Sequence, residues 1–358
     1  MLLANITNPP CSPGAEKDFP SGIHLLRMPL PFKLDHINVY LLEDGDGCVL
    51  IDTGLADKQS EQRWEEVLES LEEAGRPLRR IILTHMHPDH LGMAQWLHDR
   101  TDATLYLTRD EWAVAHALWS PSAEDAVAWR HYIDHLGLPE DLFEKLLNNP
   151  DAYRKLVPRL PESVEFICDG DSFNIGGRHW DVIVGRGHSP EHACLWCAQE
   201  SILISGDHIL PDITPNIGVM HVGLTNPLND YMLSLKAFEE LQPKWVLPAH
   251  GRIMSGPISR TRELLEHHEQ QLARLLNFCA TPRSAFECTE YMFGAYRDMP
   301  RFLFAVREAL AHLNYLVVNG DVRSWESTSP RLYQTSNISE PLAEIFNATE
   351  PFLEIFNV

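Results

Sequence analysis

Apolar and polar positions follow two different periods along the first third of the chain. Residues 23–54 contain apolar runs around a D-G-D-G turn, which predicts two strands joined as a hairpin. Residues 59–75 repeat apolar positions at helical spacing and end at a glycine, so they predict an amphipathic helix. The run RRIILTH at 79–85 predicts a buried strand, and residues 93–100 begin another helix.

Residues 109–160 differ from their surroundings because they carry helical patterns and no strand signal. We interpret them as a helical insertion, either a lid over a site or packing material. Strands then alternate with a helix, in the order strands within 164–185, strands 193–198 and 201–207, helix 230–242 and strand 244–251. This alternation predicts a layered α/β architecture with sheets inside and helices outside.

The chain changes character again after residue 258. Residues 259–330 read as three helices and a short strand-like end, which suggests a small winged-helix-like α+β domain. In the tail, residues 331–358, EPLAEIFN at 340–347 recurs as EPFLEIFN at 350–357. Two copies are too few for a solenoid, and the repeat suggests no function.

Charge disfavours two classes of partner. The formal net charge is -22, and a protein this acidic repels nucleic acid and anionic membranes at long range. Residues 259–330 hold eight arginines and nine acidic residues, so no basic stripe marks them as a DNA-reading domain. No stretch approaches 18 apolar residues and the N-terminus lacks the pattern of a signal peptide, so we expect a cytoplasmic protein with no membrane span.

The seven cysteines are scattered and odd in number, which is typical of free thiols in a reducing compartment. Cys194 and Cys197 form a C-x-x-C, a spacing also found in redox motifs. They lie in an apolar run that reads as a strand, where residues three apart point to opposite faces. We therefore favour buried thiols.

A cluster of metal-type donors leaves the strand at 79–85. The loop Thr84-His85-Met86-His87-Pro88-Asp89-His90 holds four nitrogen or oxygen donors in six residues. His85 and His87 are two apart, so an extended chain aims both side chains the same way. A metal ion needs several such donors at about 2.0–2.2 Å. Packing alone does not explain this cluster.

Three further donors each stand at the end of a predicted strand. His188 lies in a G-H-S-P loop, Asp207 follows an apolar strand, and His250 precedes Gly251. Neighbouring glycines allow the backbone to pass close to an ion. Each of these donors alone is a weak signal.

The H-x-H-x-D-H loop, followed in order by a lone His, an Asp and a final His, resembles the metallo-β-lactamase superfamily over about residues 23–255. The resemblance implies a four-layer αββα sandwich as the catalytic domain, residues 23–258, after an N-terminal extension at 1–22. It also implies a first metal held by His85, His87 and His188, a second held by Asp89, His90 and His250, and Asp207 as a ligand of both.

Asp52, in the sequence D-T-G at residues 52–54, matches a further family motif in which the aspartate supports a metal ligand. A simple turn residue is the alternative. His192, His208 and His221 are candidates for substrate contact. Against this, His192 reads as a strand-start residue, and the side chain beside a ligand such as Asp207 usually points away from the site.

The resemblance implies two divalent cations, zinc first, with iron or manganese as alternatives. A hydroxide shared by the cations would attack the substrate, and Asp89 would orient it or take up a proton. The C-terminal module is similar to that of β-lactamase-like-protein-2-type and glyoxalase-II-related members.

We therefore expect hydrolysis of a small-molecule thioester, ester or lactone. The alternatives are an endoribonuclease or other nuclease and, from another class, a DNA-binding regulator. The sequence leaves open whether the chain forms a homodimer.

Overall fold

A computed structural model describes residues 19–32, 34–148, 155–256, 259–295, 299–325 and 330–336 of the chain. Most of the predicted N-terminal extension and both copies of the tail repeat lie outside these residues. In the described part, no helix combines the length and apolar character that crossing a bilayer requires.

The first sheet has six strands in chain order, and its first three strands are antiparallel. Side chains alternate between its two faces: Leu50 packs toward the helices, whereas Val49 and Ile51 pack toward the second sheet. The predicted hairpin is present, with Gly45 in the left-handed conformation at its turn. The strands are β1 (Ile23–Pro29), β2 (His36–Asp44), β3 (Gly47–Ile51), β4 (Leu78–Ile82), β5 (Thr104–Thr108) and β6 (Glu165–Ile167).

The second sheet also has six strands, in the order β12-β11-β10-β9-β8-β7. On β9 the side chain of Cys194 packs toward the helices and that of Cys197 toward the first sheet, so the two thiols lie on opposite faces, as predicted. The strands are β7 (Ser172–Ile175), β8 (Arg178–Gly185), β9 (His192–Cys197), β10 (Ile202–Gly206), β11 (Trp245–Pro248) and β12 (Met254–Ser255).

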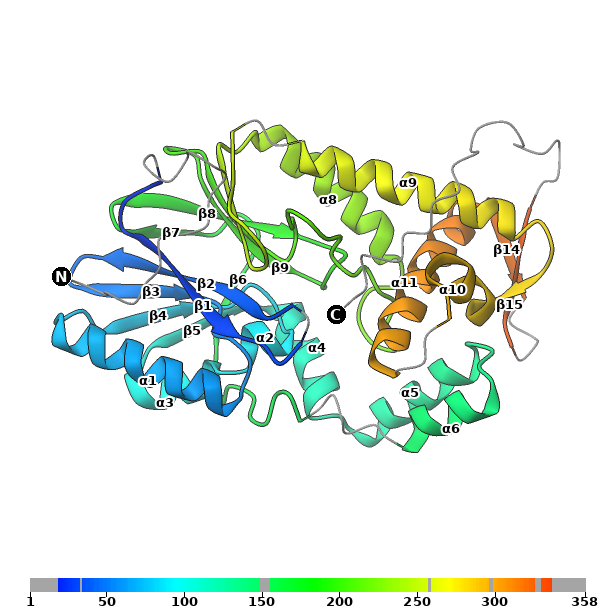
Figure 1. The fold of residues 1–358 in the computed structure, drawn as a ribbon, viewed down its shortest axis with the longest axis horizontal. Helices are drawn as coiled ribbons and strands as arrows, with labels where there is room; N and C mark the ends of the chain where they lie inside the picture. Colours follow the sequence, from blue (N-terminus) through cyan, green and yellow to red (C-terminus); the bar gives the residue numbers. More distant parts are fainter. Residues whose placement is uncertain are drawn as a thin grey trace.

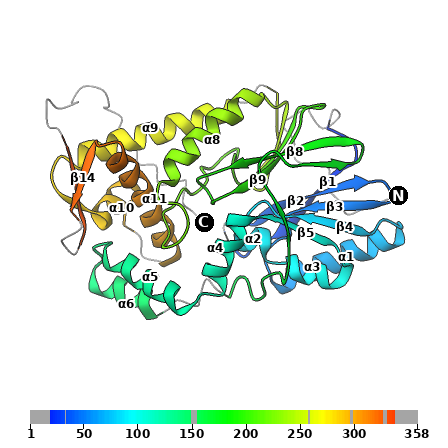
Figure 2. The same cartoon turned by 180° about the vertical axis from the view of Figure 1, so that it is seen from behind.

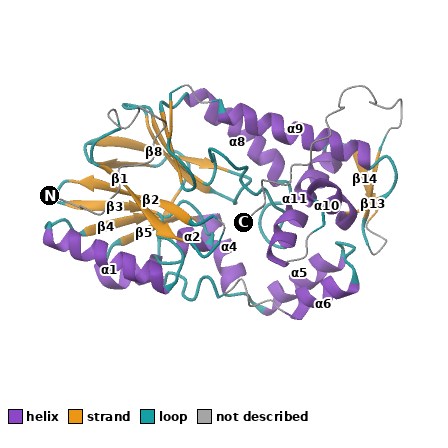
Figure 3. Ribbon diagram, viewed as in Figure 1, coloured by secondary structure: helices purple, strands orange, loops and turns teal. Residues whose placement is uncertain are grey.

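Helices cover the outer faces of both sheets, which confirms the predicted αββα sandwich (Figures 1 and 3). In α1, Asp57 accepts the backbone N–H of Ser60 at the N-cap, and the helix buries Trp64, Val67 and Leu71 on one face. The helices on the first sheet are α1 (Lys58–Glu73), α2 (Pro88–Leu91), α3 (Ala94–Thr101) and α4 (Arg109–Trp119), and those on the second are α8 (Pro227–Leu241) and α9 (Arg260–Phe278).

The predicted helical insertion divides into two parts. Helix α4 buries Val114, Ala115 and Trp119 in the same core as α1 and α3. By contrast, α5 (Ala123–Asp134) and α6 (Glu140–Asn148) pack in one core with the helices near the C-terminus, below which Figures 1 and 2 place them. The insertion therefore touches both the sandwich and the C-terminal region.

The C-terminal region comprises α9, two more helices and a three-stranded sheet in the order β13-β15-β14. The three helices agree with the predicted count. The predicted strand-like end is one strand of a three-stranded sheet, and the last strand of that sheet lies beyond residue 330, within the predicted tail. The winged-helix assignment stays a prediction. The remaining elements are β13 (Arg283–Ser284), α10 (Ala285–Phe293), α11 (Met299–Val318), β14 (Val322–Trp325) and β15 (Leu332–Thr335).

Candidate metal centre

The seven predicted donors come together at one edge of the sandwich. They lie in the segments that follow β4, β8, β10 and β11, where the sheet strands end. Two groups of potential ligand atoms form, and within each group the atoms lie within 4.8 Å of one another. The first group is His85, His87, His188 and Asp207, and the second is Asp89, His90 and His250.

In the first group three imidazoles face one point. Nε2 of His85 lies 2.8 Å from Nδ1 of His87, and Nε2 of His188 lies 3.1 Å from the same Nδ1. Nε2 of His85 and Nε2 of His188 are 3.3 Å apart. Ligands held tetrahedrally at about 2.1 Å from an ion are about 3.4 Å apart. The triangle of nitrogens therefore has the size that one cation requires.

Asp207 joins the first group to the second. Its Oδ2 lies 3.6 Å from Nε2 of His188 and 3.5 Å from Nε2 of His90. Its Oδ1 lies 3.4 Å from Nε2 of His250, which is also 3.3 Å from Oδ2 of Asp89. One carboxylate thus reaches ligand atoms of both groups, the geometry expected of a bridge between two cations.

The chemistry of these donors fits divalent cations. Facing imidazole nitrogens cannot all be satisfied by hydrogen bonds to one another, and both Nε2 of His90 and Oδ1 of Asp207 are buried without a hydrogen-bond partner. Burial, together with the neighbouring imidazoles, lowers the pKa of His85 well below its usual range and that of His87 to about 3. Both rings are therefore neutral, as a metal ligand must be.

The second group carries the negative charge. Burial raises the pKa of Asp89, but the imidazoles of His90 and His250 outweigh that effect and hold it at about 2. For His250, burial lowers the pKa, but the carboxylates of Asp207 and Asp89 outweigh that effect and raise it to about 10. The carboxylates thus stabilise positive charge at this edge, whether it is carried by a protonated imidazole or by a metal cation. Because a cation replaces the protons, we expect metal binding to release protons here.

Asp52 supports the loop that carries these ligands. Its carboxylate accepts the backbone N–H of Thr84 at 2.8 Å, the Thr84 hydroxyl at 2.9 Å and Nδ1 of His90 at 2.8 Å. The Asp52 backbone is left-handed, with φ 61°, and the side chain is buried. A buried non-glycine residue in this conformation is uncommon, so the surrounding structure must stabilise it.

Other ligand histidines also use their outer ring nitrogen. Nδ1 of His250 lies 3.1 Å from the backbone oxygen of His36, and Nδ1 of His188 lies 2.9 Å from that of Asn216. Nδ1 of His85 lies 3.0 Å from the hydroxyl of Thr84. Such contacts fix the tautomer and aim Nε2 at the site.

The structure corrects two of the predicted substrate contacts, because the side chains of His192 and His208 are completely buried. His192 stacks on His85 and accepts the backbone N–H of Asp207 at 3.1 Å, so it supports the ligands from beneath. His208 packs on Tyr231, Phe238 and the ring of His192, and burial lowers its pKa to about 3.

His221 lies in the long segment between β10 and α8, and its ring packs on Trp129 of α5, with ring centres 5.3 Å apart. The same segment receives a hydrogen bond from the hydroxyl of Tyr132 to the carbonyl of Val219. The insertion therefore contacts the segment that follows Asp207. A substrate contact by His221 stays a prediction.

Glu111 on α4, which no sequence pattern marks as functional, is a completely buried acid. Its two carboxyl oxygens accept backbone N–H groups from two different ligand loops, those of Met86 at 3.0 Å and Glu191 at 2.8 Å. Glu111 thus ties the loop between His85 and His87 to the loop that follows His188. Its sequence neighbourhood, an ordinary helix start, carries no signal of this role.

We expect Glu111→Ala to lower the free energy of unfolding by about 2–3 kcal/mol, because two buried N–H groups lose their acceptor. Burial raises the pKa of Glu111 from its usual 4.5 to about 7. Its stabilising contribution is therefore complete below about pH 4.5 and decreases as the pH rises through 7. Urea unfolding of the wild type and the variant at pH 6 and pH 8 tests both points.

Exposed Glu65 on α1 is the matched control for this measurement, and Glu65→Ala should leave stability nearly unchanged. A loss for Glu111→Ala no larger than that of Glu65→Ala would show that Glu111 does not hold the two loops together.

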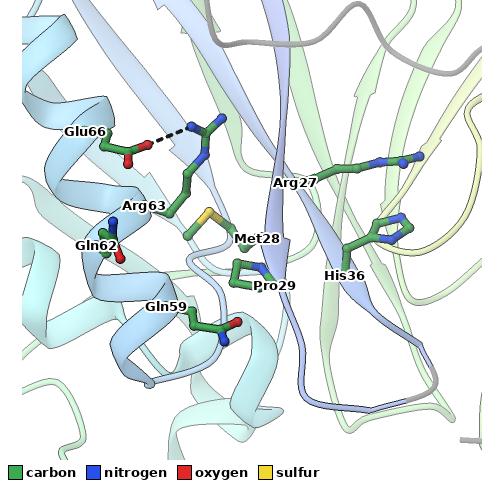
Figure 4. A pocket seen from close by; sticks show the side chains of 8 residues that line it. All are labelled: Arg27, Met28, Pro29, His36, Gln59, Gln62, Arg63 and Glu66. Carbon is green, nitrogen blue, oxygen red and sulfur yellow. Dashed lines mark hydrogen bonds and ion pairs between the residues drawn. The ribbon is translucent and has the colours of Figure 1, made fainter.

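An open pocket of about 290 Å³ lies between β1 and α1. Figure 4 shows Arg27 and His36 on one side of the strand and Arg63 with Glu66 on α1 on the other. None of the predicted metal ligands lines it, but the backbone oxygen of one lining residue, His36, contacts Nδ1 of His250. The pocket therefore gathers two arginine side chains, Arg27 and Arg63, on the surface of a protein whose net charge is strongly negative.

The sandwich and this edge cluster of histidines and aspartates define a metallohydrolase class of protein. The family model of the metallo-beta-lactamase superfamily matches residues 33–250, and that of the metallo-beta-lactamase-like C-terminal domain matches residues 272–330. The chain belongs to the metallo-beta-lactamase superfamily, as the resemblance of its motifs indicated.

Similar proteins agree with this assignment. The chain is 25% identical to "Probable metallo-hydrolase YqjP" of Bacillus subtilis over 85% of this chain and 95% of that protein. It is 34% identical to a crystal structure of a beta-lactamase domain protein from Burkholderia ambifaria, with TM-score 0.78 over 88% of this chain and 93% of that one. An "Atrochrysone carboxyl ACP thioesterase" of Aspergillus fumigatus is 23% identical over 69% of this chain and 61% of that protein.

Proposed function

We propose that the protein is a dinuclear metal-dependent hydrolase that cleaves a small-molecule thioester, with esters and lactones as related substrates. One observation carries the dinuclear part of this proposal: the carboxylate of Asp207 reaches ligand atoms of both donor groups. Family membership and the relatives support the coarser statement, a metallohydrolase.

Two bound divalent cations, with zinc as the first candidate, supply a nucleophilic hydroxide at neutral pH and stabilise the developing oxyanion. The protein's own residues orient the reaction. Asp89 is anionic and is partly exposed at the mouth of the centre, so its carboxylate is the group best placed to accept a proton from water. The imidazoles of His85, which is buried, and His87, which is partly buried, stay neutral and hold their positions.

Two considerations favour a thioester among the acyl substrates. One relative of this chain is named as an acyl-carrier-protein thioesterase. A thiol has a pKa of about 8.5, so it leaves as a thiolate without needing a strong acid. The cationic side chains at the β1 pocket, Arg27 and Arg63, would suit an acyl carrier with a phosphate.

The test is thiol release from a panel of acyl-CoA, acyl-glutathione and acyl-pantetheine thioesters. The protein is loaded separately with zinc, iron or manganese, and its own seven cysteines are subtracted with a blank. We expect turnover that His87→Ala abolishes and that His179→Ala, a change of an exposed histidine on β8, leaves intact. The best acyl group and carrier then identify the substrate class.

A lack of thiol release, in protein that holds two metal ions, would reject the thioester. Esters and lactones follow in the same assay. Cleavage of labelled RNA, with binding that weakens steeply as salt rises, would instead support the nuclease.

A further inference from the structure

Helix α11, in the C-terminal region, contacts the segment that follows the bridging ligand Asp207. The backbone N–H of Val219 donates to the carbonyl of Arg307 at 3.0 Å. Further along, the side chain of Asn314 donates to the carbonyl of Thr225 at 2.9 Å. The family model of the C-terminal domain covers this helix, whereas the model of the catalytic domain covers the segment. The two matched regions therefore meet at residues 216–225.

One of these contacts leads to a metal ligand. Asn216 accepts Nδ1 of His188 with its backbone oxygen at 2.9 Å. Its side-chain amide donates to Oε2 of Glu308 at 2.8 Å and to the carbonyl of Phe304 at 3.3 Å. The chain of contacts therefore runs from His188 through Asn216 to α11. The contact between His188 and Asn216 spans 28 residues of sequence, and the contact between Asn216 and Glu308 spans 92.

Glu308, the last residue in this series of hydrogen bonds, is buried inside the protein. Glu308 is 1% exposed, and its neighbours Ala305 and Ala309 on α11 are completely buried. Burial raises the pKa of Glu308 to about 8, so the acid is mostly protonated at neutral pH. A protonated carboxyl still accepts the amide of Asn216, and it avoids the cost of an unpaired buried charge. Stability alone does not require an acid at this buried position.

Backbone placement around Asn216 is tight. A side chain at Gly218 would come within 2.9 Å of Cβ of Arg307, so the segment passes very close to α11. Little freedom remains for the carbonyl of Asn216, and its direction sets the tilt of the imidazole of His188. Contacts to the outer nitrogen of a ligand typically change metal affinity by 10–100-fold.

We propose that Glu308 is a positioning residue of the metal centre: it holds Asn216, which fixes the ring and tautomer of His188, so that the C-terminal domain completes the first metal site. This inference rests on the proposed dinuclear centre, but not on the thioester substrate. Its consequence is that the affinity of the first metal depends on a residue of the appended domain.

The test compares Glu308→Leu, which removes the acceptor, with Glu308→Gln, whose amide oxygen can still accept from Asn216. Metal affinity of the full-length protein is measured by competition with a chelator, and the ligand field by the visible spectrum of the cobalt-loaded protein. For Glu308→Leu we expect one of the two ions to bind about 10–100-fold more weakly, with a changed cobalt spectrum. Glu308→Gln should restore both to within about threefold.

Asn314→Ala is the matched control, because it removes another hydrogen bond between α11 and the same segment without reaching a ligand. It should leave both metal affinities and the cobalt spectrum unchanged. If Glu308→Leu does not fold, Asn216→Ala removes the other partner and should weaken the same ion.

Wild-type affinities and spectrum in Glu308→Leu, or in Asn216→Ala where that variant replaces it, would overturn the proposal. So would a Glu308→Gln variant as weak as Glu308→Leu. Because metal binding is read directly, these results do not depend on finding the substrate. Failure to bind two ions in the wild type would instead reject the dinuclear centre itself.

Discussion

Replacement of Asp207 by alanine should remove bound metal from both sites and lower hydrolysis by at least about 1,000-fold. Its carboxylate lies within 3.6 Å of ligand nitrogens from both groups. Without it, the first site keeps three neutral imidazoles, and the second loses one of its two carboxylates. Both sites therefore lose negative charge that offsets the charge of the cations.

Metal content after gel filtration, read by elemental analysis, and the turnover of the best thioester test this prediction together. His188→Ala provides the comparison, because it should deplete the first site more than the second. Asp212→Ala, a change of an exposed aspartate five residues along the same segment, should have no effect. An Asp207→Ala protein that retains two ions with wild-type affinity would exclude Asp207 as a bridging ligand.

The second large effect is expected for Asp52→Ala, which should lower the free energy of unfolding by about 3 kcal/mol. The change leaves the backbone N–H and hydroxyl of Thr84 and Nδ1 of His90 without their acceptor. His90 also loses the group that orients its ring, so the second ion should bind about 10–100-fold more weakly.

Denaturant unfolding of metal-free protein and chelator competition separate these two consequences. Asp102→Ala is the matched control, since Asp102 also has a left-handed backbone, with φ 55°, but is exposed at the end of α3. It measures the backbone cost of alanine alone, which is about 1 kcal/mol. Equal losses for the two variants, with unchanged metal affinity, would mean that Asp52 is only a turn residue.

Local patterns marked the candidate donors, and the resemblance of their order to the superfamily predicted which of them hold each metal. His85, His87, Asp89 and His90 are close in sequence, and a loop that leaves a buried strand can aim adjacent donors at one point. His188, Asp207 and His250 each follow a strand, and the ends of neighbouring strands meet at the edge of a sheet. The hairpin at Gly45 and the opposite faces of Cys194 and Cys197 followed from the same short-range rules.

Side-chain direction at the histidines beside the ligands could not be obtained in this way. His192 and His208 had the chemistry of substrate contacts, but both turned out to be buried beneath or behind the site. Their orientation depends on the packing of His208 against α8 and of His192 against His85. Packing partners from other elements decide such directions, and a single sequence does not display them.

The sequence by itself determined a layered α/β architecture and the order and chemistry of the donors, because strand period and donor spacing are local properties; the four-layer αββα form came from the resemblance of the motifs to the superfamily. Apart from Asp52, which the D-T-G motif indicated, only the tertiary structure decided which residues support those donors. Glu111 and Asn216 contact the ligand loops across 25 and 28 residues, and Glu308 reaches Asn216 across 92. Such contacts form only after separate elements pack together. Burial and backbone hydrogen bonding bring these side chains to the metal centre, and the spacing of residues along the sequence does not reveal them.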